Sequence, residues 1–457
     1  MSHATAPTAV ERAVSLWNQL LEAPHVAEQT HEALMRGIDA RGLRYGTRPI
    51  STFLRPRFIS SEVWRQCERA GAWFHVSLAR LMPLLAADRA ILDDLGIHDG
   101  LADLVHACAS PSPLSFLRLD GFMDDGVLRL VEFNADSPGG AAFVDGLDEV
   151  YRSLPIFQAF SRQVALRRRP SLPLIWRAVE SAARFFRIAQ PRVAIVDWRE
   201  VATVNEFHII AADLERHGIA ATVCDPREIE LRGDVVMAAG SPVDIVLKRV
   251  LVTDLAARPD DSAALVEALR RRLVVALNPV AVQAVTTKNL LALFWEGRFD
   301  RILSARARAV WKRHIPLTLR VRDGAFERDG RKEDIGPWIL ANRERLVLKP
   351  SDAWGADGVR LGWTCTDGEW SSALAEALRV GDHVVQERVA IPLERYPELD
   401  EGVLRHRDMR TEISPYTFSP RTSGEVLARL SANDLMNVKT GGGVVATYVV
   451  DAVTDSP

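Results

Sequence analysis

The sequence has few cysteines and no excess of charge of one sign. Its four cysteines lie far apart, without CxxC spacing, so they form neither a disulfide framework nor a zinc site. This usage fits a reducing compartment, and we expect a cytoplasmic protein. Lys and Arg total 57 against 60 Asp and Glu, a net charge of −3, which gives no electrostatic reason to expect a nucleic-acid partner.

Long apolar runs, targeting segments and common nucleotide motifs are also missing. No apolar run approaches the roughly 18 residues of a membrane-spanning helix, so no membrane association is expected. The N-terminus lacks a basic segment followed by an apolar run, so we expect no secretion signal. No GxGxxG follows the first strand of the α/β stretch and GxxxxGK[ST] is absent, which argues against a dinucleotide site and a Walker-type NTPase.

The most informative stretch is residues 116–140, FLRLDGFMDDGVLRLVEFNADSPGG. Two apolar-rich runs flank Asp124-Asp125-Gly126, a turn signal that predicts a β-hairpin. Because side chains alternate along a strand, the even-numbered polar residues share one face. Pairing about the turn places two polar residues of the first run opposite two of the second: Asp120 opposite Glu132, and Arg118 opposite Asn134.

Two carboxylates face each other in this predicted hairpin. At about 4 Å, Asp120 and Glu132 repel by roughly 4 kcal/mol at an effective dielectric near 20, so the face favours a bound cation. With the amide oxygen of Asn134 they form an all-oxygen ligand set, which suits Mg²⁺ better than zinc. A solvated hairpin face with one isolated arginine remains the alternative. The residues of opposite parity are expected to pack into a core: Leu117, Leu119, Val131 and Phe133.

The chain of 457 residues, 47% of them hydrophobic, is long enough for roughly two or three domains. Three- and four-residue apolar spacing predicts helices at 10–21, 61–86 and 90–109. Short apolar strands at 192–196, 220–224 and 245–247, with a helix at 205–217 between the first two, predict a parallel sheet. We therefore divide the chain into four parts: a helical N-terminal region (1–113), the metal-binding hairpin (114–147), a helical linker with an α/β unit (148–284), and nucleotide-binding lobes with a lid loop near 350–360 (285–453).

Further along the chain, Lys349 ends an apolar strand that runs into a loop containing Gly355 and Gly358. An ammonium group followed by exposed backbone amides is a way to hold polyphosphate, although many lysines simply cap strand ends. Ser137, in the small-residue turn after the hairpin, can bind a carboxylate, or the turn is an ordinary loop. Arg410 can meet a substrate carboxylate or a phosphate, with a surface ion pair as the alternative. Other residues that are individually weak nucleotide-site candidates are Lys288, Gln386, Glu387, Lys439 and Gly442.

Together these motifs resemble the ATP-grasp ligases, whose metal-binding hairpin carries R-x-D, then E-x-N, then a proline–glycine turn. In most members this hairpin follows the lysine strand. Here it precedes Lys349 by more than two hundred residues, an order similar to that of the circularly permuted branch. That branch includes eukaryotic-type glutathione synthetase and bacterial glutathionylspermidine synthetase.

The resemblance implies a permuted ATP-grasp fold of the α/β (α+β) class, with an N-terminal helical region and a Rossmann-like pre-ATP-grasp subdomain. It also implies roles for the motif residues, with Arg118 stabilising the acyl-phosphate and the later tetrahedral oxyanion. The implied magnesium ligands are Asp120, Glu132 and Asn134. The implied ATP contacts are Lys288, Lys349, Gly355, Gly358, Gln386, Glu387, Lys439 and Gly442.

The implied activity is ATP-dependent ligation of a small-molecule carboxylate to an amine through an acyl-phosphate, with ATP and Mg²⁺ as cofactors. An ATP-grasp kinase and a non-catalytic nucleotide-binding relative remain alternatives. No acidic cluster stands out as a polyamine pocket, so the sequence favours an amino acid or short peptide as product. Relatives in this branch are often dimers, which leaves a homodimer as an open expectation.

Overall fold

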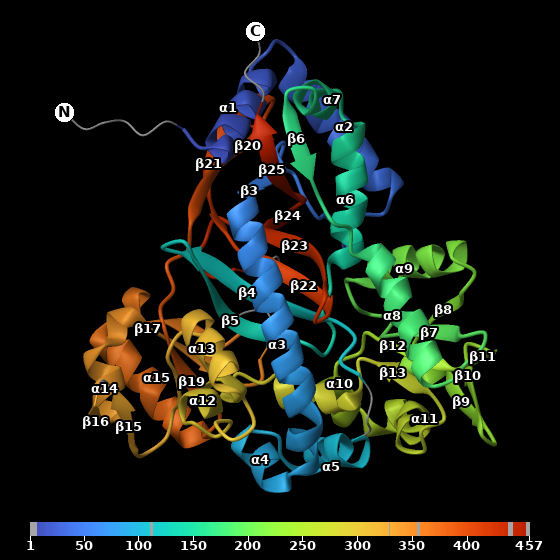
Figure 1. Ribbon diagram of the computed structural model, residues 1–457, viewed down its shortest axis with the longest axis vertical. Helices are drawn as coiled ribbons and strands as arrows, with labels where there is room; N and C mark the ends of the chain where they lie inside the picture. Colours follow the sequence, from blue (N-terminus) through green and yellow to red (C-terminus); the bar gives the residue numbers. More distant parts are fainter. Residues whose placement is uncertain (1–6, 110–112, 329, 354–356, 437–441, 454–457) are drawn as a thin grey trace.

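The computed structural model describes residues 7–109, 113–328, 330–353, 357–436 and 442–453. Helices and strands alternate along the chain, so the predicted mixed α/β class is confirmed. A seven-stranded sheet lies in the middle, with an α/β unit on one side and a four-stranded sheet with its own helices on the other (Figure 1).

The N-terminal region is mainly helical, as predicted. Its helices are α1 (Ala9–Leu21), α2 (Val26–Ala40), α3 (Ser61–Ala87), α4 (Arg89–Asp94) and α5 (Asp99–Ala107). The single helix predicted at 90–109 is two helices, because the chain turns through Gly96, which has a φ of 78° that other residues rarely adopt. The sequence did not predict the short strands β1 (Arg44–Tyr45), β2 (Arg48–Pro49) and β3 (Arg57–Ser60).

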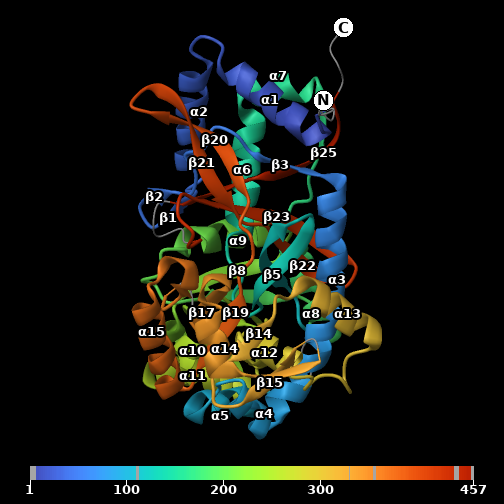
Figure 2. The ribbon, with the colours of Figure 1, turned by 90° about the vertical axis from the view of Figure 1, so that its left-hand side faces the viewer.

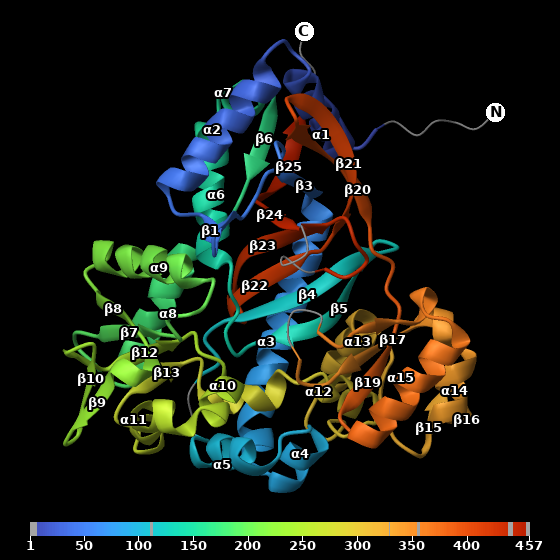
Figure 3. The ribbon, with the colours of Figure 1, turned by 180° about the vertical axis from the view of Figure 1, so that it is seen from behind.

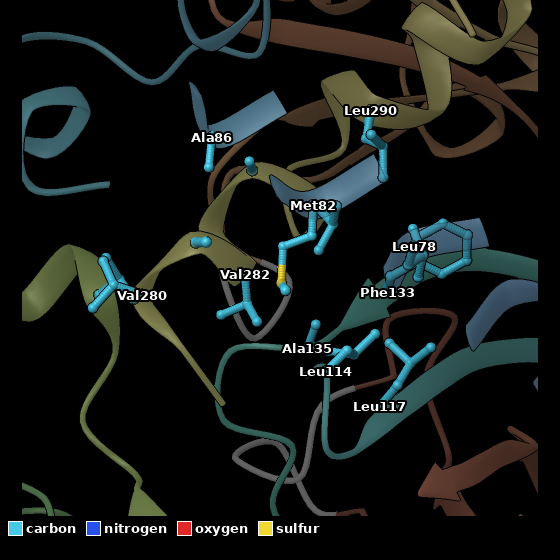
Figure 4. Packing of buried hydrophobic residues seen from close by; sticks show 14 of the residues in the cluster. Leu78, Met82, Ala86, Leu114, Leu117, Phe133, Ala135, Val280, Val282 and Leu290 are labelled. Carbon is cyan, nitrogen blue, oxygen red and sulfur yellow. The ribbon is translucent and has the colours of Figure 1, made fainter. Parts of the chain in front are cut away.

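Helix α3 is the core helix of this region. It starts at Ser60, whose side chain accepts a hydrogen bond from the Val63 amide. Within the described ranges, it is the one helix that is long and apolar enough, by length and composition alone, to cross a membrane. Here it packs in a core cluster, where its Leu78 and Met82 lie near Leu117 and Phe133 of the hairpin (Figure 4). The helix therefore supports the hairpin from its apolar side.

The predicted hairpin is confirmed and lies within the central sheet. Its strands are β4 (Leu117–Asp124) and β5 (Val127–Asn134). The sheet order is β20-β21-β23-β22-β4-β5, with β24 also paired to β23. The remaining strands of this sheet are β20 (Leu393–Asp400), β21 (Val403–Thr411), β22 (Ser414–Ser419), β23 (Thr422–Ser431) and β24 (Gly443–Val445). Because Arg118 pairs with Tyr416, the hairpin completes a sheet built from the C-terminal part of the chain.

The predicted parallel sheet is confirmed as the four-stranded sheet β13-β12-β7-β8. Its strands are β7 (Arg192–Val196), β8 (Ala220–Cys224), β12 (Ile245–Lys248) and β13 (Val275–Leu277). The helices of this unit include α8 (Leu172–Phe185), α9 (Val204–Arg216), α10 (Val252–Ala257) and α11 (Pro259–Arg270). A small separate sheet consists of β9 (Ile229–Arg232), β10 (Val235–Ala238) and β11 (Ser241–Val243).

The segment before this unit contains α6 (Ala141–Ser153), α7 (Pro155–Ser161) and β6 (Val164–Arg167). It was predicted to be helical, and β6 is the exception. This strand pairs with β25 (Thr447–Val453), which also pairs with β3.

On the other side of the central sheet, strands β17 (Leu346–Pro350) and β19 (His383–Glu387) lie where the sequence predicted them. They form the sheet β14-β19-β17-β18, which packs against α14 and α15, and we call this unit the β17–β19 lobe. Its other elements and neighbours are α12 (Asn289–Trp295), α13 (Ala305–His314), β14 (Thr318–Arg320), β15 (Ala325–Arg328), β16 (Arg331–Asp334), α14 (Ile335–Ala341), β18 (Arg360–Leu361) and α15 (Asp367–Val380).

The arrangement leaves one face of the hairpin sheet free of α3. Figure 3 shows this face, with the α/β unit on one side and the β17–β19 lobe on the other. In the view of Figure 2 the β17–β19 lobe lies in front, with the α/β unit behind it. Polar residues on this face of β4 and β5 are therefore placed between the two units.

Candidate functional site

The predicted pairing of polar residues on the hairpin is correct: Asp120 lies opposite Glu132, and Arg118 opposite Asn134. Arg118 donates to both oxygens of Asp120, at 2.6 Å from Nε and 2.8 Å from Nη2. Asn134 donates from Nδ2 to Asp120 at 2.8 Å and to Glu132 at 3.4 Å. The four side chains thus form one connected polar cluster.

The apolar face of the hairpin was expected to pack into the core, and this prediction is correct for three of its four residues. Leu117, Leu119 and Phe133 are buried in the core, but Val131 is only partly buried. The pairing shifts by one residue after Asp120, since Gly121 lies opposite Leu130, and Val131 is the extra residue. A bulge of this kind turns a side chain away from its regular face, which explains why Val131 lines a cavity instead.

A second arginine, Arg429 on β23, joins the hairpin cluster and was not predicted from the sequence. Its Nη2 donates to Asp120 at 2.7 Å, and its Nε donates to Glu412 at 2.9 Å. Glu412 lies between β21 and β22 and is 2% exposed. Arg429 is a single arginine in an apolar strand and belongs to no recognisable motif. Its position next to Asp120 therefore becomes apparent only from the pairing of the strands.

The arginines of this cluster shift the pKa values of its buried carboxyl groups. Burial alone would raise the pKa of Asp120, but Arg118 and Arg429 hold it below its ordinary value. Burial raises the pKa of Glu412 above its ordinary value, even though Arg429 opposes this shift. The repulsion expected between Asp120 and Glu132 is therefore offset by arginines of the chain itself.

One cavity lies between the hairpin and the β17–β19 lobe, and we call it the lobe cavity. Two predicted lysines line it. Lys288 is 8% exposed, with its Nζ 3.7 Å from a Glu132 oxygen and donating to the Ala353 carbonyl at 2.8 Å. Lys349 donates to Gln386 Oε1 at 2.7 Å, and burial lowers its pKa to about 8. The lobe cavity therefore gathers two cationic groups next to a carboxylate.

Gln386 and Glu387, two of the predicted ATP contacts, line the lobe cavity as well. The side chain of Gln386 connects Lys349 to Thr318, donating to Thr318 Oγ1 at 3.0 Å. Glu387 forms an ion pair with Arg328, with 3.1 Å between Glu387 Oε1 and Arg328 Nη2. The structure thus gathers Asp120, Glu132, Lys288, Lys349, Gln386 and Glu387 around one cavity, although they are spread over more than 250 residues of the sequence.

Four other predicted nucleotide contacts are not among the residues that line the lobe cavity. Two of them, Gly355 and Lys439, lie outside the described residues. Gly358 has a φ of 72° and follows the Lys349 strand, and Gly442 directly precedes β24. Arg410 forms an ion pair with Asp434 and donates to the Ala432 carbonyl at 3.0 Å, so its predicted substrate contact stays a prediction.

A second cavity of about 380 Å³ lies on the other side of the hairpin cluster, and we call it the large cavity. Arg118 and the predicted Ser137 line it, together with Arg429, which also lines the lobe cavity. Its volume is within the range of small-molecule sites. Arg118 and Arg429 therefore connect the two cavities through their shared partner Asp120.

The α/β unit supplies residues of the large cavity that were missed in the sequence. Asp197 follows β7, Arg249 follows β12, and Asp254 is on α10. The sequence did contain a signal for these residues, because ligands of parallel α/β sheets bind beyond the carboxyl ends of the strands. Asp197 and Arg249 are the first residues after their strands and fit that rule.

The polar cluster fits a magnesium site only in part. Glu132 is the best candidate ligand, because its side chain is 28% exposed and lines the lobe cavity next to the lysines. Asp120 also lines this cavity, but its oxygens accept bonds from Arg118, Arg429 and Asn134. Among the described residues, no group of three or more His, Cys, Asp or Glu is arranged to hold a metal ion. The donor set is all oxygen, as Mg²⁺ prefers.

The overall fold is similar to that of a solved glutathione synthetase-like effector from Globodera pallida. The TM-score is 0.60 over 94% of this chain and 99% of that chain, at 12% sequence identity, so the similarity shows the fold alone. A candidate gamma-glutamylcysteine synthetase from Methylobacillus flagellatus has a TM-score of 0.44 at 14% identity, over 78% of this chain and 84% of that chain, and supports no argument. No protein-family model and no curated protein matches the sequence. The chain therefore shares the fold of this glutathione synthetase-like effector over nearly its whole length.

Proposed function

We propose that the protein is an ATP-dependent carboxylate–amine ligase with a circularly permuted ATP-grasp fold. The observation that carries this proposal is the polar cluster of the hairpin, which lies between two cavities of different chemistry. The lobe cavity has lysines suited to phosphates, and the large cavity has the size and polarity suited to a small organic acid. The pairing of Arg118 with Tyr416, far apart in the sequence, supports the permuted order.

In this proposal ATP binds in the lobe cavity. The ammonium groups of Lys288 and Lys349 lie beside its phosphates and spread the charge that develops on the transferred group. Apolar side chains of the β17–β19 lobe, such as Val347 and Leu361, line the same cavity and offer a surface for the adenine ring. Gln386 and Glu387 lie at the end of β19, where a strand edge can present backbone groups to a base.

Glu132 would be the main magnesium ligand, with Asp120 and Asn134 beside it. Mg²⁺ held there would neutralise negative charge on the phosphates of ATP. Arg118 and Arg429 hold Asp120 by hydrogen bonds, which fixes the carboxylate in place. The amide of Asn134 donates hydrogen bonds to both carboxylates and so links them.

The acid substrate binds in the large cavity with its carboxylate next to Arg118. This guanidinium, held by Asp120 and the Gly139 carbonyl at 2.7 Å, stabilises the negative charge of the acyl-phosphate and of the tetrahedral adduct formed when the amine attacks. The products are an amide, ADP and phosphate. Ser137 lines the same cavity, and we propose that its hydroxyl donates a hydrogen bond to this carboxylate.

A kinase that stops at a phosphorylated product is the second candidate, because it would use the same ATP site. The two activities differ in what ADP release requires. We expect purified protein with Mg²⁺ and ATP to release ADP at a sustained rate only when a carboxylic acid and an amine are both present. Sustained ADP release with a single acceptor, giving a stable phosphorylated product, would replace the ligase proposal with the kinase.

A further inference from the structure

The large cavity contains two carboxylates, Asp197 and Asp254, that form no ion pair among the described residues. Each arginine lining the cavity has its own acidic partner: Arg118 pairs with Asp120, Arg249 with Glu206 and Arg429 with Glu412. By contrast, neither Asp197 nor Asp254 forms an ion pair with any residue in the described part of the chain. The cavity therefore has a surplus of negative charge on its α/β side.

Asp197 and Asp254 line the same cavity, and the charge of Asp254 acts on Asp197. Burial raises the pKa of Asp197 to about 6, and the charge of Asp254 adds to that shift. Arg249 and Lys248 act in the opposite direction on Asp197, and Arg258 does so on Asp254. One oxygen of Asp197 accepts a hydrogen bond from the Trp198 amide at 2.8 Å, which leaves the other oxygen for a ligand.

The same cavity also presents a buried donor that lacks a partner. Arg249 is 6% exposed, and its Nε has no hydrogen-bond partner among the described residues, although its Nη1 donates to the Pro138 carbonyl at 3.0 Å. A buried N–H group of this kind favours an acceptor on a ligand. The cavity thus combines sites for a cationic group and for an anionic group.

The rest of the cavity wall is mainly apolar. Side chains from four separate parts of the chain contribute to it, namely Ile50, Phe143, Leu251, Leu427, Met436 and Val444. A second carboxylate, as in a glutamyl group, would meet no unpaired cation there. A polyamine would place its further ammonium groups against apolar walls, which is unfavourable.

We propose that the large cavity binds a zwitterion with an apolar body, whose ammonium group lies against Asp197 and Asp254. The substrate class is a free amino acid or short peptide with an apolar side chain. This inference deepens the proposed function and rests on it, since the ligand's carboxylate is the group to be activated. A zwitterion carries both charged groups on one molecule, so a ligand that lacks either the ammonium or the carboxylate should bind more weakly.

The test is calorimetric titration of the purified full chain, without nucleotide, with a panel of matched probes. L-phenylalanine and leucyl-leucine are expected to bind at least about tenfold more tightly than N-acetyl-L-phenylalanine, L-glutamate and spermidine, because a buried charged contact is worth this much. Phenethylamine, which keeps the ammonium and the apolar body but lacks the carboxylate, should also bind at least about tenfold more weakly than L-phenylalanine. If it binds as tightly as L-phenylalanine, the cavity does not recognise a zwitterion and the inference is wrong.

Variants then assign the effect to the two carboxylates. Asp197→Asn combined with Asp254→Asn should weaken L-phenylalanine binding at least about tenfold, whereas Asp254→Glu, which keeps the charge, should stay within about threefold of the parent. ATP affinity, measured in parallel, should not change in either variant. Equal binding of N-acetyl-L-phenylalanine, preference for glutamate or spermidine, or no binding by any probe would overturn the inference. ATP binding and two-substrate ADP release are separate readouts, so the proposed function can stand if this inference fails.

Discussion

Lys248 and Asp136 form an ion pair in which both side chains are completely buried. Lys248 ends β12 of the α/β unit, and Asp136 lies at the exit of the β4–β5 hairpin, where it also accepts a hydrogen bond from the Val252 amide at 2.8 Å. The pair joins the unit that carries Arg249 to the loop that carries Ser137. It therefore fixes two walls of the large cavity relative to each other.

Replacing Lys248 with Met should strongly destabilise the protein, because Asp136 would remain buried without its cation. Breaking a buried pair by removing one partner costs about 3–5 kcal/mol. The measurement is the free energy of unfolding from urea titration. The double variant Lys248→Met with Asp136→Asn should recover part of this loss, and a single variant as stable as the parent would show that the pair does not hold the junction.

Glu132→Gln tests the magnesium assignment. The amide keeps the shape of the side chain but removes the charge facing the lysines, so turnover at saturating ATP should fall at least about 100-fold. Asp125→Asn, an exposed change in the turn of the same hairpin, is the matched control and should leave turnover within about twofold. Unchanged activity in Glu132→Gln would remove this residue from the metal site.

The pH dependence of ATP binding should depend on Lys349, whose pKa is lowered to about 8 by burial. Because the ammonium loses its proton as pH rises through this value, ATP affinity should fall by up to about tenfold between pH 7.5 and pH 9. Lys349→Arg keeps its charge over this range and should flatten the profile. The exposed substitution Lys332→Arg serves as the control. Parallel profiles for the parent and Lys349→Arg would show that this titration does not affect the phosphates.

Gly121→Ala tests the bulge that sets the hairpin register. A Cβ atom at this position would lie 2.2 Å from the backbone oxygen of Arg129, so the strands would have to separate. Overpacking of this kind costs about 1–3 kcal/mol, and here it falls on backbone that has little freedom to move. Urea unfolding should show a loss in that range, whereas Gly126→Asn, in the turn where nothing lies within 4 Å and Asn tolerates the positive φ, should cost less.

Much of the fold was predictable from local sequence. The alternation of polar and apolar residues and a turn signal were sufficient to predict the β4–β5 hairpin and the pairing of Asp120 with Glu132. Short apolar strands predicted the parallel sheet. Partners distant in sequence were not predictable, because strand order in a sheet depends on long-range packing. The pairing of β4 with β22, and with it the place of Arg429, is of this kind.

In the candidate site, too, some residues were predictable from local sequence and others depend on long-range packing. Residues within motifs, such as Glu132 and Lys349, were identified because their neighbours carry a pattern. Asp197, Arg249 and Asp254 stand alone in the sequence and meet only when β7, β12 and the hairpin exit come together. Val131 was assigned to the wrong face, since a one-residue bulge reverses the alternation on which that prediction depended.

The transfer of ¹⁸O from a labelled carboxylic acid to inorganic phosphate tests the central claim most directly. Once the ADP-release screen has given an acid and an amine that react, the acid is supplied with ¹⁸O in its carboxylate, and the phosphate is analysed by mass spectrometry. If the acid attacks the γ-phosphate and the amine then displaces phosphate, one labelled oxygen must leave with each phosphate released. Phosphate without label would contradict the acyl-phosphate route and the ligase function built on this site.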